Sequence, residues 1–229
     1  DPMGTPEILL MVSKDVIVFD NVKSRMQLIS LVDPEYPDAF ASTTNSLRKL
    51  AEQLSNSVPP ISDTNTNPPP EEDDFVSEFG QDQYMEAVGT IREYIHAGDV
   101  MQVVLAQRLS IPFDAAPINL YRSLRSLNPS PYMYFMNLRD FHIVSSSPEI
   151  LARVEDGTIV NRPLAGTRRR GYTEEEDKAL ETELLNDPKE ISEHLMLIDL
   201  GRNDVGRVAQ IGSVKVTEQF AVERYSHVM

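Results

Sequence analysis

The 229-residue sequence contains no cysteine. That absence excludes a disulfide-stabilised scaffold and a zinc site built on thiolates. The sequence also lacks an apolar run long enough to span a bilayer. Its first residues, DPMGTPEILL, have neither the basic start nor the apolar stretch of a signal peptide. We therefore expect a soluble protein of the cytoplasm.

Basic residues are scarce as well. The chain has 21 Lys and Arg residues against 36 Asp and Glu residues, which gives a formal net charge of −15. Such a balance argues against a surface that binds nucleic acid or an anionic membrane. Hydrophobic residues make up 41% of the chain, enough for the core of one large domain or two small ones.

Hydrophobic periodicity predicts strands alternating with helices. In the first part we expect strands over 7–12, 15–20 and 25–32 and a helix over 38–54. In the middle we expect a helix over 81–97 capped by Gly98, a Val-rich strand over 100–113 and a helix over 117–127. In the last part we expect strands over 132–138, 141–146, 149–155, 158–161 and 213–218, and helices over 173–186 and 188–200. Runs of antiparallel strands broken by helices indicate the α+β class.

The domain organisation follows from composition. Residues 1–54 read as partial N-terminal strands and a helix, 55–80 as an acidic, Pro-rich linker or long surface loop, and 81–229 as part of a larger domain. The chain begins almost at once in sheet and ends in AVERYSHVM without a cap or polar tail. We therefore expect an internal fragment of a longer protein.

The stretch NRPLAGTRRRG (161–171) concentrates positive charge in this acidic protein. A Gly-Thr turn offers backbone amides and a hydroxyl, and a following arginine pairs well with a carboxylate or phosphate. The stretch therefore fits an anion site. Charge alone, however, favours a solvated basic loop that offsets the acidic run Glu174–Asp177.

A second stretch, NDPKEISEHLMLIDLGRND (186–204), predicts a helix capped by Asp187, with Glu190 completing a capping box. Glu193 lies one turn further along the same face, beside the apolar segment 195–200, which we expect to be buried. Two carboxylates so placed could share a Mg²⁺ ion. The alternative is a salt bridge from Glu193 to Arg202 or Lys189.

Two further groups of residues carry weaker signals. Glu149, in SSSPEIL (145–151), follows a proline at a strand edge, where a general acid or an ordinary surface residue could lie. The four histidines show no ligand spacing, and His194 reads as a half-buried helix residue. Spacing alone thus predicts an acidic α+β protein with a possible anion and metal site.

The sequence resembles the chorismate-utilising enzymes in five segments that keep that family's order and intervals: GDVMQVVLAQRL (98–109), SSSPEIL (145–151), PLAGTRRRG (163–171), LLNDPKEISEHLMLIDLGRNDVGRV (184–208) and VERYSHVM (222–229). The resemblance is continuous from about Gln81 to Met229. It implies an α+β fold of large antiparallel sheets packed face to face with helices outside, incomplete in this chain.

Two positions favour the anthranilate synthase large-subunit branch of this family. Water-adding members carry a lysine base at the position of Gln102, and common aminodeoxychorismate synthases carry a nucleophilic lysine at the position of Ala165. Neither residue can activate water or attack the ring. The resemblance thus implies a lyase that makes anthranilate and pyruvate from chorismate and ammonia for tryptophan biosynthesis. An aminodeoxychorismate synthase component, or a non-catalytic module that binds tryptophan or chorismate, is the alternative.

The resemblance also implies roles for single residues. Glu190 and Glu193 would hold Mg²⁺ against the ring carboxylate of chorismate. Glu149 would be the acid that helps the C4 hydroxyl leave as ammonia adds at C2. Gly166 and Thr167 would contact the substrate carboxylate, with PLAGTRRRG forming a positive wall of the site.

Regulation and partners are implied in the same way. The stretch NPSPYM (128–133) resembles the part of these subunits that binds tryptophan as inhibitor, through Asn128, Pro129, Tyr132 and Met133. A glutaminase subunit would deliver ammonia. The family's catalytic histidine would come directly after Met229, and His227 does not replace it by position. The resemblance therefore implies about half a site, inactive alone.

Overall fold

The computed structural model describes residues 3–56 and 68–229. The chain divides into two compact units, one on each side of the stretch 57–67, and each is described by itself. Among the described residues, no helix is both long and apolar enough to cross a membrane.

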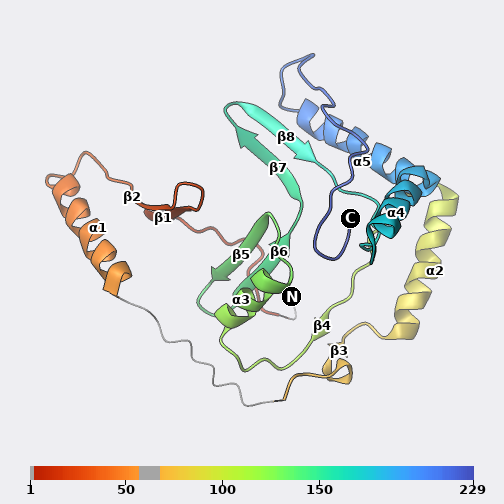
Figure 1. The fold of residues 1–229 in the computed structure, drawn as a ribbon, viewed down its shortest axis with the longest axis horizontal. Helices are drawn as coiled ribbons and strands as arrows, with labels where there is room; N and C mark the ends of the chain where they lie inside the picture. Colours follow the sequence, from red (N-terminus) through yellow and green to blue (C-terminus); the bar gives the residue numbers. More distant parts are fainter. Residues whose placement is uncertain (1–2, 57–67) are drawn as a thin grey trace. The chain divides into compact units, whose positions relative to one another are not determined.

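The first unit is a β-hairpin and a helix (Figure 1). Strands β1 (Asp15–Asp20) and β2 (Arg25–Ser30) pair antiparallel, with Asp15 opposite Ser30, and α1 (Ala39–Asn56) contacts β2. These elements confirm three of the predictions. The strand expected over 7–12 is wrong, because this apolar segment pairs with no other strand of the described chain.

The second unit combines helices with two-stranded antiparallel ribbons, which confirms the α+β class. Its helices are α2 (Gln81–Ala97), α3 (Pro117–Leu127), α4 (Glu174–Asn186) and α5 (Pro188–Gly206), preceded by a 3-10 turn, η1 (Glu72–Asp74). Its strands pair as β3 (Val76–Ser77) with β4 (Leu109–Ser110), β5 (Tyr132–Asn137) with β6 (His142–Ser147), and β7 (Ile150–Glu155) with β8 (Thr158–Arg162).

Two expected strands of this unit are wrong. Of the run 100–113 only Leu109–Ser110 forms a strand, and 213–218 has no regular structure. Part of the stretch 55–80 lies outside the described residues, while its remainder contains η1 and β3.

Local signals fix the helix ends. Gly98 ends α2 in the left-handed conformation, with φ of 80°, which glycine adopts without strain. Pro117 occupies the first turn of α3, where a missing N–H costs nothing. Thr173 caps α4 by accepting from the Glu176 amide at 3.2 Å.

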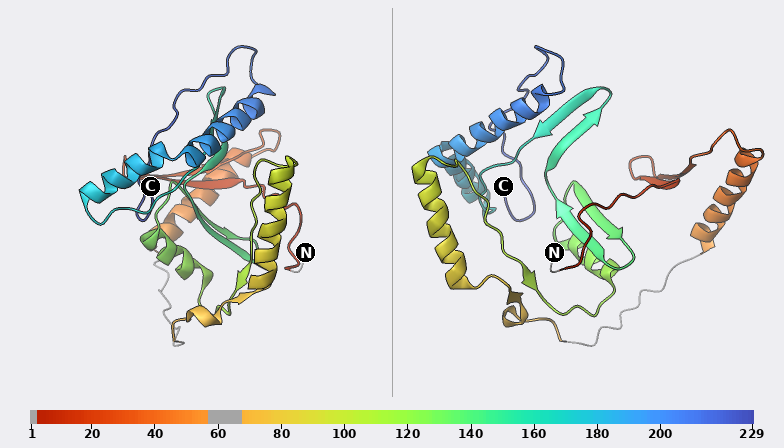
Figure 2. Two further views of the ribbon diagram at one scale, coloured as in Figure 1. Left: turned by 90° about the vertical axis from the view of Figure 1, so that its right-hand side faces the viewer. Right: turned by 180° about the vertical axis from the view of Figure 1, so that it is seen from behind.

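Helices pack on the ribbons of the second unit. Helix α3 contacts β5 and β6, while α5 contacts β8 and α4 (Figures 1 and 2). Gly201 makes the close approach of α5 possible, since a Cβ there would lie 2.3 Å from Oδ1 of Asn161 in β8. Leu195 and Leu200 of α5 remain 47% and 49% exposed, so the predicted burial of segment 195–200 is wrong for this chain.

Candidate functional site

A cavity of about 250 Å³ lies where the 163–167 segment, the start of α5 and the 220–229 segment meet. Apolar side chains dominate its lining, among them Leu184, Ile191 and Met229. Four predicted site residues line it, Asn128, Gly166, Thr167 and Glu190, and so does His194. Such a mostly apolar cavity with a few polar groups is the usual form of a small-molecule site.

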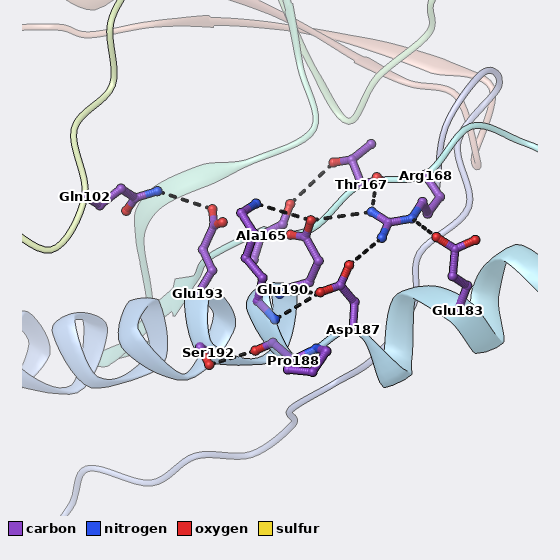
Figure 3. A network of polar contacts seen from close by, with 11 residues as sticks. Gln102, Ala165, Thr167, Arg168, Glu183, Asp187, Pro188, Glu190, Ser192 and Glu193 are labelled. Atoms are coloured by element: carbon purple, nitrogen blue, oxygen red, sulfur yellow. Dashed lines mark hydrogen bonds and ion pairs between the residues drawn. The ribbon is translucent and has the colours of Figure 1, made fainter. Parts of the chain in front are cut away.

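Glu190 is half-buried against the 165–168 loop. Its own side chain is 15% exposed, and Arg168 donates to its Oε1 at 3.5 Å through Nη1. A Cβ on Gly166 would lie 2.7 Å from Oε2 of Glu190, so only glycine lets the loop pass this close. Figure 3 shows Glu190 and Glu193 projecting from the same side of α5.

The capping box predicted for α5 is half right. Oδ1 of Asp187 accepts from the amides of Lys189 at 3.0 Å and Glu190 at 3.5 Å, which confirms it as the cap. The Asp187 amide, however, donates to the Leu184 carbonyl at 3.4 Å rather than to Glu190. The Glu190 carboxylate is turned to Arg168 instead, because an arginine from a distant loop offers a charged donor.

Arg168 joins the end of α4 to the start of α5. Its guanidinium contacts Glu183 at 3.1 Å and Asp187 at 2.8 Å as well as Glu190 (Figure 3). Hydrogen bonding to Glu183 and then Asp187 raises the pKa of Arg168 although partial burial opposes it. Burial likewise opposes the charge on Asp187, but hydrogen bonds from two backbone amides and from Arg168 lower its pKa. Of the three arginines, Arg168 is thus the one that pairs with the cavity carboxylate Glu190.

Glu193 contacts neither of the basic residues expected for an ordinary salt bridge. Its Oε1 accepts from Nε2 of Gln102 at 3.3 Å. Arg202 pairs with Asp199 at 2.7 Å, and Lys189 reaches Glu190 at 3.5 Å. Glu193 lies beside the cavity rather than in its lining.

Glu149 is held by the backbone of the cavity wall. Its Oε1 accepts from the Leu164 amide at 2.8 Å, and Leu164 and Pro148 line the cavity. The Thr167 hydroxyl donates to the Ala165 carbonyl at 3.4 Å, so it lies within its own loop. Glu149 itself is exposed and lies at the edge of the cavity.

The other two arginines of the run 168–170 pair with the acidic run Glu174–Asp177, as the alternative interpretation predicts. Arg169 forms an ion pair with Glu176 and lies 4.9 Å from the Tyr172 ring centroid. Arg170 contacts Asp177 through Nε at 2.9 Å and Nη2 at 3.0 Å. Within the expected positive wall, Arg168 is therefore the arginine whose guanidinium pairs with Glu190.

The four residues of the predicted tryptophan stretch lie at the junction of α3 and β5. Asn128 follows α3 directly and lines the cavity, and its carbonyl accepts from the Ser146 hydroxyl at 2.8 Å. Tyr132 and Met133 begin β5, half-buried, while Pro129 is exposed. Of these four, the cavity takes in only Asn128.

Comparison with known proteins settles the family. The sequence matches the chorismate binding enzyme family over residues 1–229. The chain belongs to this family. It is 56% identical over 230 residues to anthranilate synthase component 1 of Pseudomonas putida, covering 100% of this chain and 47% of that protein. Against the same component of Neisseria meningitidis serogroup B it is 49% identical over 230 residues, covering 100% and 46%.

A solved structure agrees with these relatives. Anthranilate synthase component I from Streptococcus pneumoniae TIGR4 superposes with a TM-score of 0.75 at 35% identity, covering 94% of this chain and 48% of that chain. The chain thus spans about half the length of the relatives it matches. The fold class and the family expected from the five sequence segments are confirmed.

The donor set of this chorismate-binding family member fits a hard cation in part. Glu190 and Glu193 offer carboxylate oxygens on successive turns of α5, which suit Mg²⁺. Within residues 3–56 and 68–229, no three acidic, histidine or cysteine side chains gather closely enough to hold a metal. Mg²⁺ commonly takes only one or two carboxylates and completes its shell with water and substrate oxygens.

Sequence reasoning missed one residue that lines the cavity and one that lies behind it. His194 lines the cavity, and its Nε2 accepts from the Phe220 amide at 3.2 Å. Asp177, one of four acids in a row, is only 12% exposed at its side chain and binds two arginines. Nothing in the run Glu174–Asp177 distinguishes Asp177 from its neighbours, because its partners come from distant segments.

Proposed function

We propose that this chain is part of the large subunit of an anthranilate synthase, which converts chorismate and ammonia into anthranilate, pyruvate and water. The observation that supports it best is the cavity shared by Gly166, Thr167 and Glu190. Sequence similarity to anthranilate synthase component 1 proteins over 100% of the chain also supports it.

The substrate's carboxylate would lie against the 165–167 loop. Its backbone and the Thr167 hydroxyl supply donors at the cavity wall, and Arg168, the next residue, donates to Glu190. Arg168 is already balanced by three carboxylates, so the wall alone offers little net positive charge for an anionic substrate. A cation held by Glu190 and Glu193 would provide that charge and orient the ring carboxylate.

Glu149 would act as the acid for the departing C4 hydroxyl. The Leu164 amide fixes one of its oxygens at 2.8 Å, so the proton would be carried on the other. Ammonia would form the new bond at C2 as the C4 hydroxyl leaves as water. Loss of the C2 proton and of the side chain as pyruvate would then leave the aromatic ring of anthranilate.

Three partners belong to the proposal: a glutaminase subunit as the source of ammonia, tryptophan as inhibitor bound near Asn128, and Mg²⁺ as cofactor. Ala165 and Gln102 disfavour the aminodeoxychorismate and water-adding alternatives, since neither side chain is a nucleophile or a base. The cytoplasm is the expected compartment.

The test uses the protein at the length at which its own cells make it. With chorismate, Mg²⁺ and ammonium, it should produce fluorescent anthranilate, and Glu193→Gln should abolish that product. Asp199→Asn is the matched control, because this carboxylate lies on the same helix but is 61% exposed and pairs with Arg202. Full activity in Glu193→Gln would refute the metal assignment. A non-aromatic amino product would instead identify an aminodeoxychorismate synthase, and tryptophan binding without any product would identify a binding module.

A further inference from the structure

Two segments far apart in sequence pair to form one side of the cavity. Arg168 and Met229 exchange backbone hydrogen bonds at 3.0 and 2.8 Å, and the Arg170 amide donates to the His227 carbonyl at 3.1 Å. Segment 168–170 directly follows Gly166 and Thr167 of the cavity lining, and segment 227–229 contains Val228 and the buried Met229. The shape of the cavity therefore depends on how these two short segments are held together.

Asp177 holds both segments through their arginines. Its carboxylate binds Arg170 by two hydrogen bonds of 2.9 and 3.0 Å, and Arg224 reaches its Oδ2 at 3.4 Å. Arg170 in turn donates to the Tyr225 carbonyl at 2.7 Å. One carboxylate thus connects the arginine stretch, the 222–229 segment and helix α4.

The backbone around Asp177 leaves it little freedom. The Gly171 amide donates to its Oδ1 at 2.7 Å, and a Cβ on Gly171 would lie 2.2 Å from the Asp177 amide nitrogen. Without the carboxylate, Arg170 would lose its acidic partner and Arg224 would keep only its ion pair with Glu181, which leaves two like charges close together in a partly buried place. These contacts lower the pKa of Asp177 well below its usual range, led by the bond from Arg170 and then that from Gly171.

We propose that Asp177 is a positioning residue of the cavity: by binding Arg170 and Arg224 together, it keeps segment 168–170 paired with segment 227–229 and so places Gly166 and Thr167. It need not touch the substrate itself. The proposal rests on the proposed function for its effect on turnover, but its structural part stands apart from it.

The first measurement is amide hydrogen exchange on the natural-length protein, with and without Asp177→Asn. We expect exchange at the Arg168, Arg170 and Met229 amides to become faster by about tenfold or more, while the amides of the β5–β6 ladder keep their rates. Uniform acceleration everywhere would show a merely global loss of stability and would overturn the proposal, as would unchanged exchange at the three amides.

The second measurement is turnover of chorismate by the same variant. Because a small displacement of substrate contacts is costly, we expect kcat/KM to fall by roughly tenfold to a hundredfold, with a higher KM. Glu176→Gln is the matched control, since it removes the carboxylate of the neighbouring pair with Arg169, whose side chain is 51% exposed. An equal loss in Glu176→Gln would overturn the proposal.

A second variant covers the case in which Asp177→Asn does not fold. Arg224→Gln changes a side chain that is 39% exposed and removes one of the two arginines from Asp177, together with the ion pair between Arg224 and Glu181. We expect the same three amides to exchange faster, by a smaller factor, and unchanged rates there would count against the proposal. If the unaltered protein makes no anthranilate, the proposed function fails, while the exchange experiment still decides the role of Asp177.

Discussion

Nε2 of Gln102 donates a hydrogen bond to Oε1 of Glu193 at 3.3 Å, and this contact joins two residues 91 positions apart. Gln102 comes from an irregular segment before β4, whereas Glu193 lies in α5 (Figure 3). The amide therefore keeps the carboxylate directed to one side of the helix. Groups that orient a metal-binding carboxylate commonly contribute to metal affinity.

Replacing this glutamine should weaken binding of Mg²⁺. In Gln102→Ala the Glu193 carboxylate loses its donor, and we expect the dissociation constant at the proposed Mg²⁺ site to rise by about tenfold or more, measured by calorimetry. Gln107→Ala is the control, because Gln107 belongs to the same segment but bonds to Ser77. Equal Mg²⁺ affinity in Gln102→Ala and the unaltered protein would contradict the prediction.

Gly166→Ala should destabilise the protein. The added Cβ would meet Glu190 and Leu184 at 2.7 to 2.9 Å, and relieving such contacts costs about 1–3 kcal/mol in the free energy of unfolding. Gly89→Ala provides the contrast, since nothing lies within 4 Å of that position in α2. There, alanine should stabilise by about 0.5–1 kcal/mol. Urea unfolding of both variants checks the opposite signs, and a stabilised Gly166→Ala would show that the loop does not pack closely on Glu190.

Stability should fall in acid through Asp177. The pKa of this carboxyl in the folded protein lies below its ordinary value of 3.8, led by the hydrogen bond from Arg170. Its contribution is therefore complete above about pH 4 and is lost as the pH falls toward the folded pKa. Asp177→Asn should lose less free energy of unfolding than the unaltered protein between pH 6 and pH 3, measured by urea unfolding. Parallel pH curves would contradict this.

The caps of α4 and α5 should differ in importance. Thr173→Ala removes a hydroxyl that accepts from one amide, which costs about 1 kcal/mol in unfolding free energy. Asp187→Ala removes a cap and also a partner of Arg168 at 2.8 Å, so we expect a larger loss. Thermal unfolding of the two variants gives the order, and a smaller loss for Asp187→Ala would show that Arg168 gains nothing from this contact.

The sequence predicted correctly the features that depend only on residues close together in the chain. Gly98 ends α2 and Pro117 begins α3 at the predicted positions, because both residues act through their own backbone geometry. The hairpins β5–β6 and β7–β8 were predicted for a similar reason, since their strands are neighbours in sequence. The strand expected over 100–113 failed, because a Val-rich run forms a strand only where a partner pairs with it.

The sequence predicted individual residues of the site but not the contacts between them. Motif resemblance identified Gly166, Thr167 and Glu190, which the fold brings to one cavity. The capping box failed at Glu190 because spacing along α5 cannot show that Arg168 competes for the carboxylate. Asp177 was overlooked for the same physical reason: its two arginines approach from other segments of the chain.

The close approach of Gly201 to Asn161 fixes the position of helix α5 along its axis relative to strand β8. Asn161 cannot yield easily, because its Nδ2 donates to the Leu151 carbonyl of the neighbouring strand at 2.8 Å. Since one residue turns an α-helix by about 100°, a single insertion between Glu193 and Gly201 would swing both glutamates away from the 165–168 loop while every side chain was retained. The number of residues in that interval is therefore as much a determinant of the site as the glutamates themselves.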